Sequence, residues 1–335
     1  MFKATFLFQD GGEVAVDVAP DQTVLEAAIA MDAPVRHDCC SGSCGTCIAE
    51  RLDGDATLAA GDMALPLTPA ELAGGLMPTC LTRLAGDTRF RLPYPLHPAA
   101  PEPARHAAHL LSVTAASPTV HRLLLEVETP EDFDFRPGQY LRIRPPGLRA
   151  VRAYSIASRP ADLPLVELLV RHVPGGQMSQ WLRDNAQPGD RMALHGPLGS
   201  FAYDDRATAH LFIAGGTGLA PVLSMIRSRS DTSPALLCFG CSKPEDLFYL
   251  AELRELAATH PNLSIRVALF DTGGAALPQG VAQGTALSVL TDADLVPGTT
   301  AYLCGPPGMI NAASQFLAGN GLPLSAIRAE RFLPS

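Results

Sequence analysis

The spacing of apolar and polar residues predicts a small mixed unit at the start of the chain. Alternation with a period of two indicates strands, and apolar residues at helical spacing indicate a helix. The pattern predicts, in order, a hairpin of residues 2–8 and 13–18 around Asp10-Gly11-Gly12, a helix over residues 23–31 that Asp21 or Thr23 caps, and a strand from Thr46 to Leu52. The proline-rich stretch from Pro93 to Pro103 then predicts a stiff linker.

Short apolar runs at even spacing fill residues 108–205. Turn sequences such as Arg136-Pro-Gly138 and Gln187-Pro-Gly-Asp190 separate them. The expected strands are residues 110–115, 120–128, 139–144, 165–173 and 191–195. This pattern is typical of a small antiparallel β-barrel.

From Ala207 onwards the pattern changes to apolar strands that alternate with helices. Residues 210–214 lead into a glycine-rich turn and a helix from Val222 to Arg229. Residues 236–240 and a run that ends near Cys304 predict two further strands, β-α-β-α-β in all, which is typical of a parallel sheet. The sequence therefore predicts a multidomain α+β and α/β protein with a unit at 1–95, a linker at 96–107, a barrel at 108–205 and an α/β domain at 206–335.

The composition excludes several classes of function without identifying one. Of the 335 residues, 47% are hydrophobic and 18% are charged, and the net charge is −9 with no basic run. We therefore expect neither nucleic acid nor an anionic membrane as a partner. The eight cysteines are scattered too widely for a disulfide framework, and the N-terminus carries no export signal, so we expect a soluble protein in a reducing cytoplasm.

Three cysteines in one short loop carry the most specific signal in the chain. Cys39, Cys44 and Cys47 have the C-x4-C-x2-C spacing of a plant-type [2Fe–2S] cluster, and Cys80 can supply the fourth thiolate. Cys40 has the wrong spacing and is expected to be a non-ligand. A zinc site is the alternative, but zinc ligands usually come as two short cysteine couples, and this loop offers one.

Two motifs in the barrel segment combine polar side chains with a glycine turn. Arg152-Ala-Tyr-Ser155 places a cation, an aromatic ring and a hydroxyl on neighbouring positions of an expected strand. Arg171 then precedes Pro174-Gly-Gly-Gln-Met-Ser179, a turn that opens a helix and presents backbone N–H groups to a phosphate. Each motif alone is weak evidence, because an isolated Arg-x-Tyr-Ser is usually just part of a strand.

A second glycine-rich loop, Gly215-Gly-Thr-Gly-Leu-Ala-Pro221, follows the first strand of the α/β segment. Its glycines allow a pyrophosphate to approach the backbone, and the N-terminus of the following helix favours negative charge. Pro221 stands where the dinucleotide fingerprint has its third glycine, so the loop by itself leaves a purely structural role open.

Together and in this order, these motifs resemble a plant-type ferredoxin joined to the ferredoxin–NADP reductase family. The resemblance implies a β-grasp ferredoxin domain, a Greek-key flavin barrel and a nucleotide domain, with a [2Fe–2S] cluster, FAD and NADH as cofactors. It implies FAD binding by Arg152, Tyr154, Ser155, Arg171, Gly175, Gly176, Met178 and Ser179. It implies nucleotide binding by Gly215, Gly216, Thr217, Gly218, Pro221, Asp246, Gly305 and Pro306. Cys304 would then lie at the site of hydride transfer, with Glu330 and Phe332 beside the flavin.

The segment after the second α/β strand bears on the choice between NADH and NADPH. In the family that the chain resembles, this segment reads the ribose. Ser242 is present, but no arginine accompanies it to bind a 2′-phosphate. Lys243 would favour a phosphate, whereas Glu245 and Asp246 would repel one and accept hydrogen bonds from free hydroxyls. We therefore expect NADH to be preferred.

The order of the modules resembles the benzoate and toluate 1,2-dioxygenase reductases along nearly the whole chain. This resemblance implies a monomeric, cytoplasmic enzyme that passes electrons from NADH through FAD and the cluster to the Rieske centre of a separate terminal oxygenase. The reductase of a soluble diiron or other multicomponent monooxygenase has the same module order and stays open. A zinc-stabilised binding protein with structural glycine loops is the alternative from a different class.

Histidines near the cysteine loop and the linker suggest acid–base or metal chemistry at first sight. They are His37, beside Asp38, and His97, His106 and His109. Because they are scattered, we expect them to be solvated surface residues. No hydrolase motif such as Gly-x-Ser-x-Gly or His-Glu-x-x-His is present in the sequence.

Overall fold

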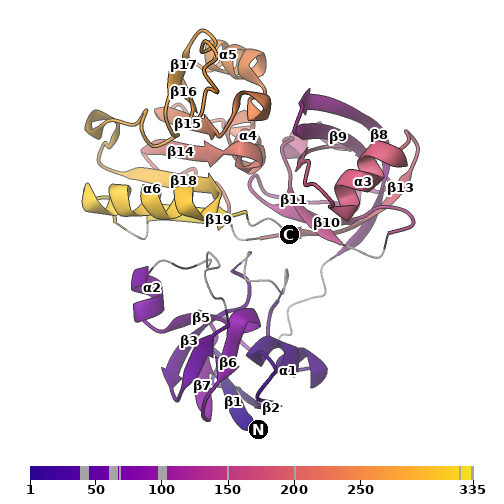
Figure 1. The fold of residues 1–335 in the computed structure, drawn as a ribbon, viewed down its shortest axis with the longest axis vertical. Helices are drawn as coiled ribbons and strands as arrows, with labels where there is room; N and C mark the ends of the chain where they lie inside the picture. The colour runs from indigo at the N-terminus through magenta and orange to yellow at the C-terminus, as the bar shows by residue number, and fades with distance from the viewer. Residues whose placement is uncertain are drawn as a thin grey trace. The chain divides into compact units, whose positions relative to one another are not determined.

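The computed structural model of the protein describes residues 1–37, 45–59, 67, 69–96, 104–148, 151–199, 201–323 and 326–332. The chain forms two compact units, Met1–Glu102 and Pro103–Pro334 (Figure 1). Strand β8 (Arg105–Ser117) begins inside the predicted linker, whose residues 97–103 lie outside the described residues. The predicted boundary near residue 205 stays a prediction, since barrel and nucleotide sheet belong to one compact unit.

A mixed sheet packed against a short helix forms the first unit. Its elements are β1 (Phe2–Leu7), β2 (Glu13–Val18), α1 (Val24–Ala30), β3 (Ile48–Asp53), β4 (Ala56–Leu58), α2 (Pro69–Ala73), β5 (Leu76–Pro78), β6 (Thr82–Leu84) and β7 (Thr88–Arg91). The sheet order is β2-β1-β7-β3-β5, and β4 pairs with β6. Thr23 caps α1 in a reciprocal capping box with Glu26, which confirms one of the two predicted caps.

An antiparallel sheet closed on itself forms the barrel of the second unit. Its elements after β8 are β9 (Val120–Val127), β10 (Tyr140–Arg144), β11 (Arg152–Ser155), β12 (Leu165–Arg171), α3 (Gln177–Asp184) and β13 (Arg191–Leu198). The order is β11-β10-β13-β8-β9-β12, and every pair in it is antiparallel. Ile156, just beyond β11, bridges to Leu168 of β12, so the two edge strands meet. Met178, Trp181 and Leu182 of α3 pack into the barrel core.

A parallel sheet with helices on both faces follows the barrel (Figure 1). Its elements are β14 (Ala209–Gly215), α4 (Leu219–Ser228), β15 (Ala235–Cys241), α5 (Leu250–Thr259), β16 (Leu263–Leu269), β17 (Val281–Gln283), β18 (Thr299–Gly305), α6 (Pro307–Gly319) and β19 (Ile327–Arg331). The strand order is β17-β16-β15-β14-β18-β19. Successive residues of β14 point to opposite faces: Phe212 packs in the cluster of α4 and α5, and Ile213 packs in the cluster of α6.

The structure confirms the predicted fold class and corrects the strand count of the α/β domain. The sequence pattern gave β-α-β-α-β, whereas β16 and β17 precede β18 and β19 follows it. Arg266 interrupts the apolar run of β16, and its guanidinium binds Asp294 at 2.6 and 2.8 Å. Helix α4 begins at Leu219 and not at Val222, because the 3-10 turn η4 (Gly216–Gly218) runs directly into it.

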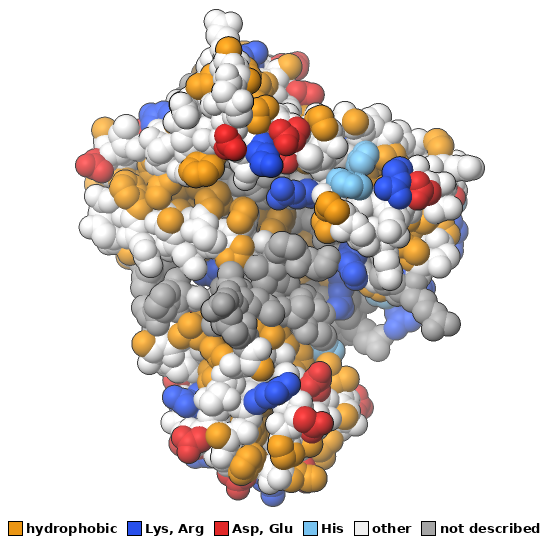
Figure 2. Space-filling model, in the orientation of Figure 1, with side chains coloured by type: hydrophobic (Ala, Val, Ile, Leu, Met, Phe, Trp, Pro, Cys, Tyr) orange, Lys and Arg blue, Asp and Glu red, His pale blue; other side chains and the backbone are white. Residues whose placement is uncertain are grey.

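In the described part of the chain, no helix combines the length and apolarity needed to cross a bilayer. Figure 2 shows acidic and basic side chains interspersed on the face that it presents, a mixed pattern in keeping with the absence of a basic run in the sequence.

A buried polar cluster lies at the amino end of β14, away from the glycine-rich loop. The His210 side chain is 0% exposed, and its Nε2 lies 2.7 Å from the hydroxyl of Tyr203, which donates to Asp231. Burial and the nearby Arg229 lower the pKa of His210 to about 4. Burial raises the pKa of Asp231, but hydrogen bonds from Arg229, Ser233 and Tyr203 outweigh it and hold that pKa below its usual range.

We expect His210 to make folding stability depend on pH. The folded-state pKa lies below the unfolded value of about 6.5, so this contribution is complete above pH 6.5 and is lost as the pH falls towards 4. The loss amounts to about 3 kcal/mol of unfolding free energy. Urea unfolding of the wild type and of His210→Gln at several pH values between 7.5 and 4.5 checks this. An identical pH slope in both proteins would contradict the assignment.

Candidate functional site

Two of the four predicted cluster ligands lie in adjacent segments of the first unit. Cys47 directly precedes β3, and Cys80 lies in the 3-10 turn η1 (Thr79–Leu81). Thr79 ties the two together, because its backbone N–H and its Oγ1 both donate to the Cys47 carbonyl, at 3.1 and 3.0 Å. Both thiol-bearing residues are buried, at 3% and 6% exposure. Cys39, Cys40 and Cys44 lie outside the described residues.

The residues just before the cysteine loop are anchored to the same core. The backbone N–H of Arg36 donates to the Tyr94 hydroxyl at 2.8 Å, and the Arg36 guanidinium carbon lies 4.2 Å from the centre of the Tyr94 ring. The exposed His37 ring contacts the Val35 carbonyl at 2.9 Å. The described donors, two buried cysteines whose segments are joined by the hydrogen bonds of Thr79 to the Cys47 carbonyl, fit a plant-type cluster.

The predicted flavin strand brings together residues from both ends of the second unit. β11 pairs with β10, and the Ser155 hydroxyl donates to Glu330 Oε2 of β19 at 3.3 Å. Arg328 holds β19 in place, because its guanidinium binds the Ala202 carbonyl at 2.8 Å and Asp204 at 2.6 Å. Two of the predicted residues, Ser155 and Glu330, are therefore in direct contact although the sequence separates them widely.

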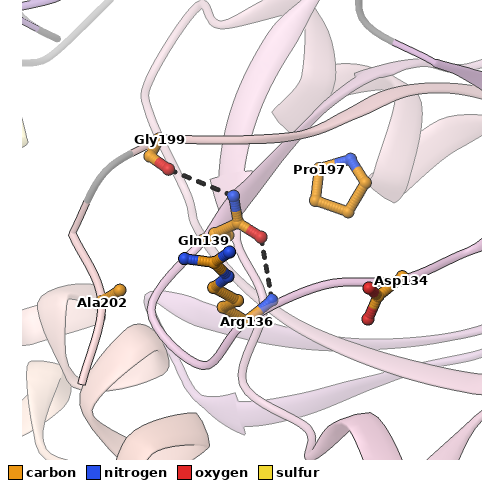
Figure 3. A pocket seen from close by; sticks show the side chains of 6 residues that line it. All are labelled: Asp134, Arg136, Gln139, Pro197, Gly199 and Ala202. Atoms are coloured by element: carbon orange, nitrogen blue, oxygen red, sulfur yellow. Dashed lines mark hydrogen bonds between the residues drawn. The ribbon is translucent and has the colours of Figure 1, made fainter. Parts of the chain in front are cut away.

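A surface hollow lies beside the start of β10, lined by Asp134, Arg136, Gln139, Pro197, Gly199 and Ala202 (Figure 3). The Gln139 side chain links two of the lining segments: its amide N–H donates to the Gly199 carbonyl at 3.1 Å, and its amide oxygen accepts from the Arg136 backbone N–H at 2.8 Å. A methyl group on Gly199 would lie 3.0 Å from the Tyr140 ring and 3.8 Å from Glu330 Oε1. The sequence analysis did not single out Gln139 and Gly199, because Gln139 only begins an expected strand and Gly199 belongs to no motif.

The predicted phosphate turn has open space beside Gly175 and an uncapped helix start at Gly176. Gly175 has a φ of +74°, and no atom lies within 4 Å of the position that a Cβ would take. Gly176 caps α3 without a side-chain hydrogen bond, which leaves the first N–H groups of the helix for a ligand. Ser179 turns its hydroxyl inward to accept from the Val173 N–H at 2.8 Å, so in this conformation it stabilises the turn itself.

The glycine loop at the end of β14 packs directly against the end of β18. A Cβ on Gly218 would lie 2.2 Å from the Cys304 carbonyl oxygen, and one on Gly215 would lie 2.8 Å from Met309 Sδ. Gly216, with a φ of +54°, has open space beside it. The glycine loop is therefore formed where the ends of β14 and β18 meet. Side chains at positions 218 and 305 would prevent this close approach, so glycine is required at both.

Cys304 is fully buried at the carboxyl end of β18, opposite Glu330 in the register with β19. Burial and the Glu330 carboxylate raise the pKa of the Cys304 thiol well above its ordinary value, so the thiol is neutral at pH 7. The backbone N–H of Phe332 donates to the Gly305 carbonyl at 2.9 Å. The three predicted catalytic residues are thus gathered around one strand end.

Arg171 and Asp246 were assigned to different cofactors, and the structure places them together. Arg171 Nη2 lies 3.8 Å from Asp246 Oδ1, which also accepts from the Thr119 hydroxyl at 2.8 Å. Asp246 lies in the 3-10 turn η5 (Pro244–Asp246) beyond β15. The Asp246 carboxylate therefore contacts barrel residues while it lies in the segment predicted to bind the ribose. The neighbouring Glu245 is exposed.

Phe270 is an exposed aromatic residue at the carboxyl edge of the parallel sheet. It follows β16, the residue is 64% exposed, and its N–H donates to the Cys241 carbonyl at 3.0 Å. Ligands of open α/β sheets bind outside the carboxyl ends of the strands. Phe270 was missed because β16 itself was missed.

We expect Phe270→Ala to weaken nucleotide binding, because the ring offers a face on which an adenine can stack. Such stacking is worth about 1–3 kcal/mol for nucleic acid bases, so the KM for NADH should rise about fivefold or more. The kcat should change little, since Phe270 lies far along the sheet edge from β18. Steady-state NADH oxidation with ferricyanide measures both constants. An unchanged KM would remove Phe270 from the site.

Comparison with known proteins identifies the family. Three family models match in succession: a 2Fe-2S iron-sulfur cluster binding domain over residues 7–85, an oxidoreductase FAD-binding domain over residues 107–203 and an oxidoreductase NAD-binding domain over residues 212–315. The toluate 1,2-dioxygenase electron transfer component of Pseudomonas putida is 31% identical over 98% of this chain and 97% of its own length. The chain belongs to the reductase components of multicomponent oxygenases.

Other relatives of this reductase serve different oxygenases. The propane 2-monooxygenase reductase component of Mycolicibacterium goodii is 30% identical over 96% of the chain and 94% of its own length. Among solved structures, an Amycolatopsis cytochrome P450 reductase superposes with a TM-score of 0.69 at 30% identity, covering 100% of this chain and 99% of the other. The reductase is thus an NADH-dependent oxidoreductase with domains for a [2Fe–2S] cluster, FAD and NAD.

Proposed function

We propose that this reductase carries electrons from NADH to the Rieske centre of a separate aromatic ring-hydroxylating dioxygenase. The observation that carries the proposal is the match with the toluate 1,2-dioxygenase electron transfer component over nearly the full length of both chains. FAD bound to the barrel would supply the acceptor for the hydride of NADH, and a [2Fe–2S] cluster would supply one-electron transfer to the partner. The enzyme is proposed to work as a monomer in the cytoplasm.

In this proposal Cys39, Cys44, Cys47 and Cys80 hold the cluster. Arg152, Tyr154, Ser155, Arg171 and the turn of Gly175, Gly176, Met178 and Ser179 hold FAD. The uncapped N-terminus of α3 supports the phosphate assignment of this turn. The link from Ser155 to Glu330 supports a role for Glu330 as an acidic neighbour of the flavin.

The nucleotide is proposed to bind along the loop of Gly215, Gly216, Thr217, Gly218 and Pro221, and against Gly305 and Pro306. The open space at Gly216 supports this placement. Cys304 then serves as a neutral contact at the hydride site, since its thiol is protonated at pH 7. Phe332 shields the flavin, and Asp246 together with Glu245 disfavours the 2′-phosphate of NADPH.

A soluble diiron or other multicomponent monooxygenase is the second candidate partner. The similarity to the propane 2-monooxygenase reductase, at 30% identity over nearly the full chain, favours it almost as strongly. The choice between a dioxygenase and a monooxygenase partner depends on the surface that binds the oxygenase, and no sequence motif identifies that surface.

An absorption spectrum followed by an anaerobic titration tests the electron path. We expect flavin and iron–sulfur bands that bleach with NADH, and NADPH as a poor substitute. A colourless protein that contains zinc and binds no flavin on reconstitution would contradict the proposal. Sedimentation at working concentration tests the monomer.

Reconstitution with purified oxygenases tests the partner. NADH-dependent turnover of an aromatic substrate should appear with a Rieske dioxygenase component and not with a diiron hydroxylase. Turnover with the diiron hydroxylase alone would replace the first candidate by the second.

A further inference from the structure

A buried carboxylate in the barrel binds groups from both halves of the second unit. Glu167 lies in β12, and its side chain is 9% exposed. Its Oε2 accepts from Arg122 Nη2 of β9 at 3.1 Å. Its Oε1 accepts from the Tyr249 hydroxyl at 3.1 Å and from Arg227 Nη1 at 3.5 Å. Arg227 belongs to α4 and Tyr249 directly precedes α5, so one carboxylate joins the barrel to the nucleotide domain.

The same place carries further hydrogen bonds between the two halves. Arg227 Nη1 also donates to the Ala157 carbonyl at 3.1 Å, and the fully buried Ser224 donates to the Ser158 carbonyl at 2.7 Å. Ser158 in turn accepts from the Glu167 backbone N–H at 3.0 Å. The C-terminal half of α4 is therefore hydrogen-bonded to Ala157 and Ser158, which follow the flavin strand.

This arrangement links the two sites that must meet for hydride transfer. Residues 157 and 158 follow the predicted flavin strand Arg152–Ser155, and α4 begins at the nucleotide loop Gly215–Gly218. A helix of ten residues transmits a displacement of its far end to its start. The position of the nucleotide loop relative to the flavin strand thus depends on the contact at Glu167.

We propose that Glu167 is a positioning residue that fixes the nicotinamide at the distance from the flavin required for hydride transfer. The proposal rests on NADH reducing the bound flavin and is independent of which oxygenase receives the electrons. Displacements of about 1 Å away from the reacting atoms can slow a reaction about a hundredfold, because reacting groups must be held close and aligned. A buried carboxylate shared by two guanidinium groups cannot be replaced by an amide without shifting them.

The test compares Glu167→Gln with the wild-type holoenzyme by anaerobic stopped-flow mixing with NADH. We expect flavin reduction at saturating NADH to slow at least tenfold while the apparent Kd for NADH stays within about threefold. The primary isotope effect with 4-deuterated NADH should rise, and the long-wavelength charge-transfer absorbance between nicotinamide and flavin should weaken. FAD content and unfolding temperature report any purely structural damage.

Glu128→Gln is the matched control. Glu128 is also a barrel carboxylate bound to an arginine, Arg191, at 2.6 and 3.0 Å, and it contacts neither α4 nor α5 in the described contacts. Its flavin reduction rate should equal that of the wild type. A slow Glu128→Gln would overturn the proposal, because any lost barrel ion pair would then have the same effect.

Arg227→Lys tests the same contact and replaces Glu167→Gln if that variant does not fold. Lysine retains the charge, but its ammonium lies nearer the backbone than Arg227 Nη1, the one nitrogen that donates to both the Ala157 carbonyl and Glu167. Flavin reduction should therefore again slow with little change in Kd. Where both single variants fold, the double variant should be no slower than Glu167→Gln alone. Wild-type reduction rates in Glu167→Gln or in Arg227→Lys, or a slower rate that only follows lost FAD or weaker NADH binding, would overturn the proposal.

Discussion

Replacing Cys80 by serine will abolish the [2Fe–2S] cluster and leave the flavin reaction intact. Cys80 and Cys47 are the described ligand candidates, and Thr79 holds their segments together through two hydrogen bonds to the Cys47 carbonyl. A serine hydroxyl is a poor substitute for the thiolate that the irons require. Iron and acid-labile sulfide should fall to near zero. Reduction of cytochrome c should fall about a hundredfold, while NADH–ferricyanide activity, which the flavin supports alone, should stay within about twofold.

Cys40→Ser is the control for this experiment. The sequence spacing excludes Cys40 from the ligand set, so this variant should keep its full iron and sulfide content. Loss of iron in Cys40→Ser with retention in Cys80→Ser would require a different set of ligands.

Gly218→Ala will damage the nucleotide loop by a steric clash. Its added methyl would lie 2.2 Å from the Cys304 carbonyl oxygen and 2.5 Å from the carbonyl carbon, and neither backbone atom can rotate away. The loop must therefore move away from the end of β18, which displaces the nicotinamide. We expect NADH-dependent flavin reduction to fall about a hundredfold or more, with a loss of about 1–3 kcal/mol in the free energy of unfolding.

Gly308→Ala provides the matched control, because no atom lies within 4 Å of its Cβ position and it sits in α6. Alanine favours a helix over glycine, so this variant should be as stable as the wild type or slightly more stable. Stopped-flow reduction and thermal unfolding of both variants give the comparison. Equal rates for Gly218→Ala and the wild type would show that the loop does not bind the nucleotide.

Local patterns in the sequence predicted most of the fold. Strands such as β14 and the hairpin of β1 and β2 are short apolar or alternating runs bounded by glycines, and their prediction was confirmed. β16 was not predicted, because Ser264 and Arg266 interrupt its apolar run. In the folded chain, the Arg266 guanidinium forms an ion pair with Asp294. His106, expected on solvated surface, instead packs its ring 4.9 Å from Phe133, because β8 extends further towards the N-terminus than the pattern indicated.

The candidate site was predictable only where its residues form contiguous motifs. The glycine loops and the cysteine loop are of this kind. The partners of Glu167 lie 45, 60 and 82 positions away in the sequence, and the partner of Ser155 lies 175 positions away. No local pattern encodes such pairs, because they arise only when barrel and sheet pack together.

The strand order of the nucleotide sheet also governs the sequence of folding events. β14 pairs with β15, the next strand in the chain, and with β18, which comes only after β16 and β17. Contacts between distant segments form slowly, because a long loop must close first. We therefore expect β14 and β15 to pair early, and the glycine loop to reach its final shape only when Cys304 and Gly305 pack beside it. During refolding, the ability to bind NADH should return later than the bulk of the secondary structure.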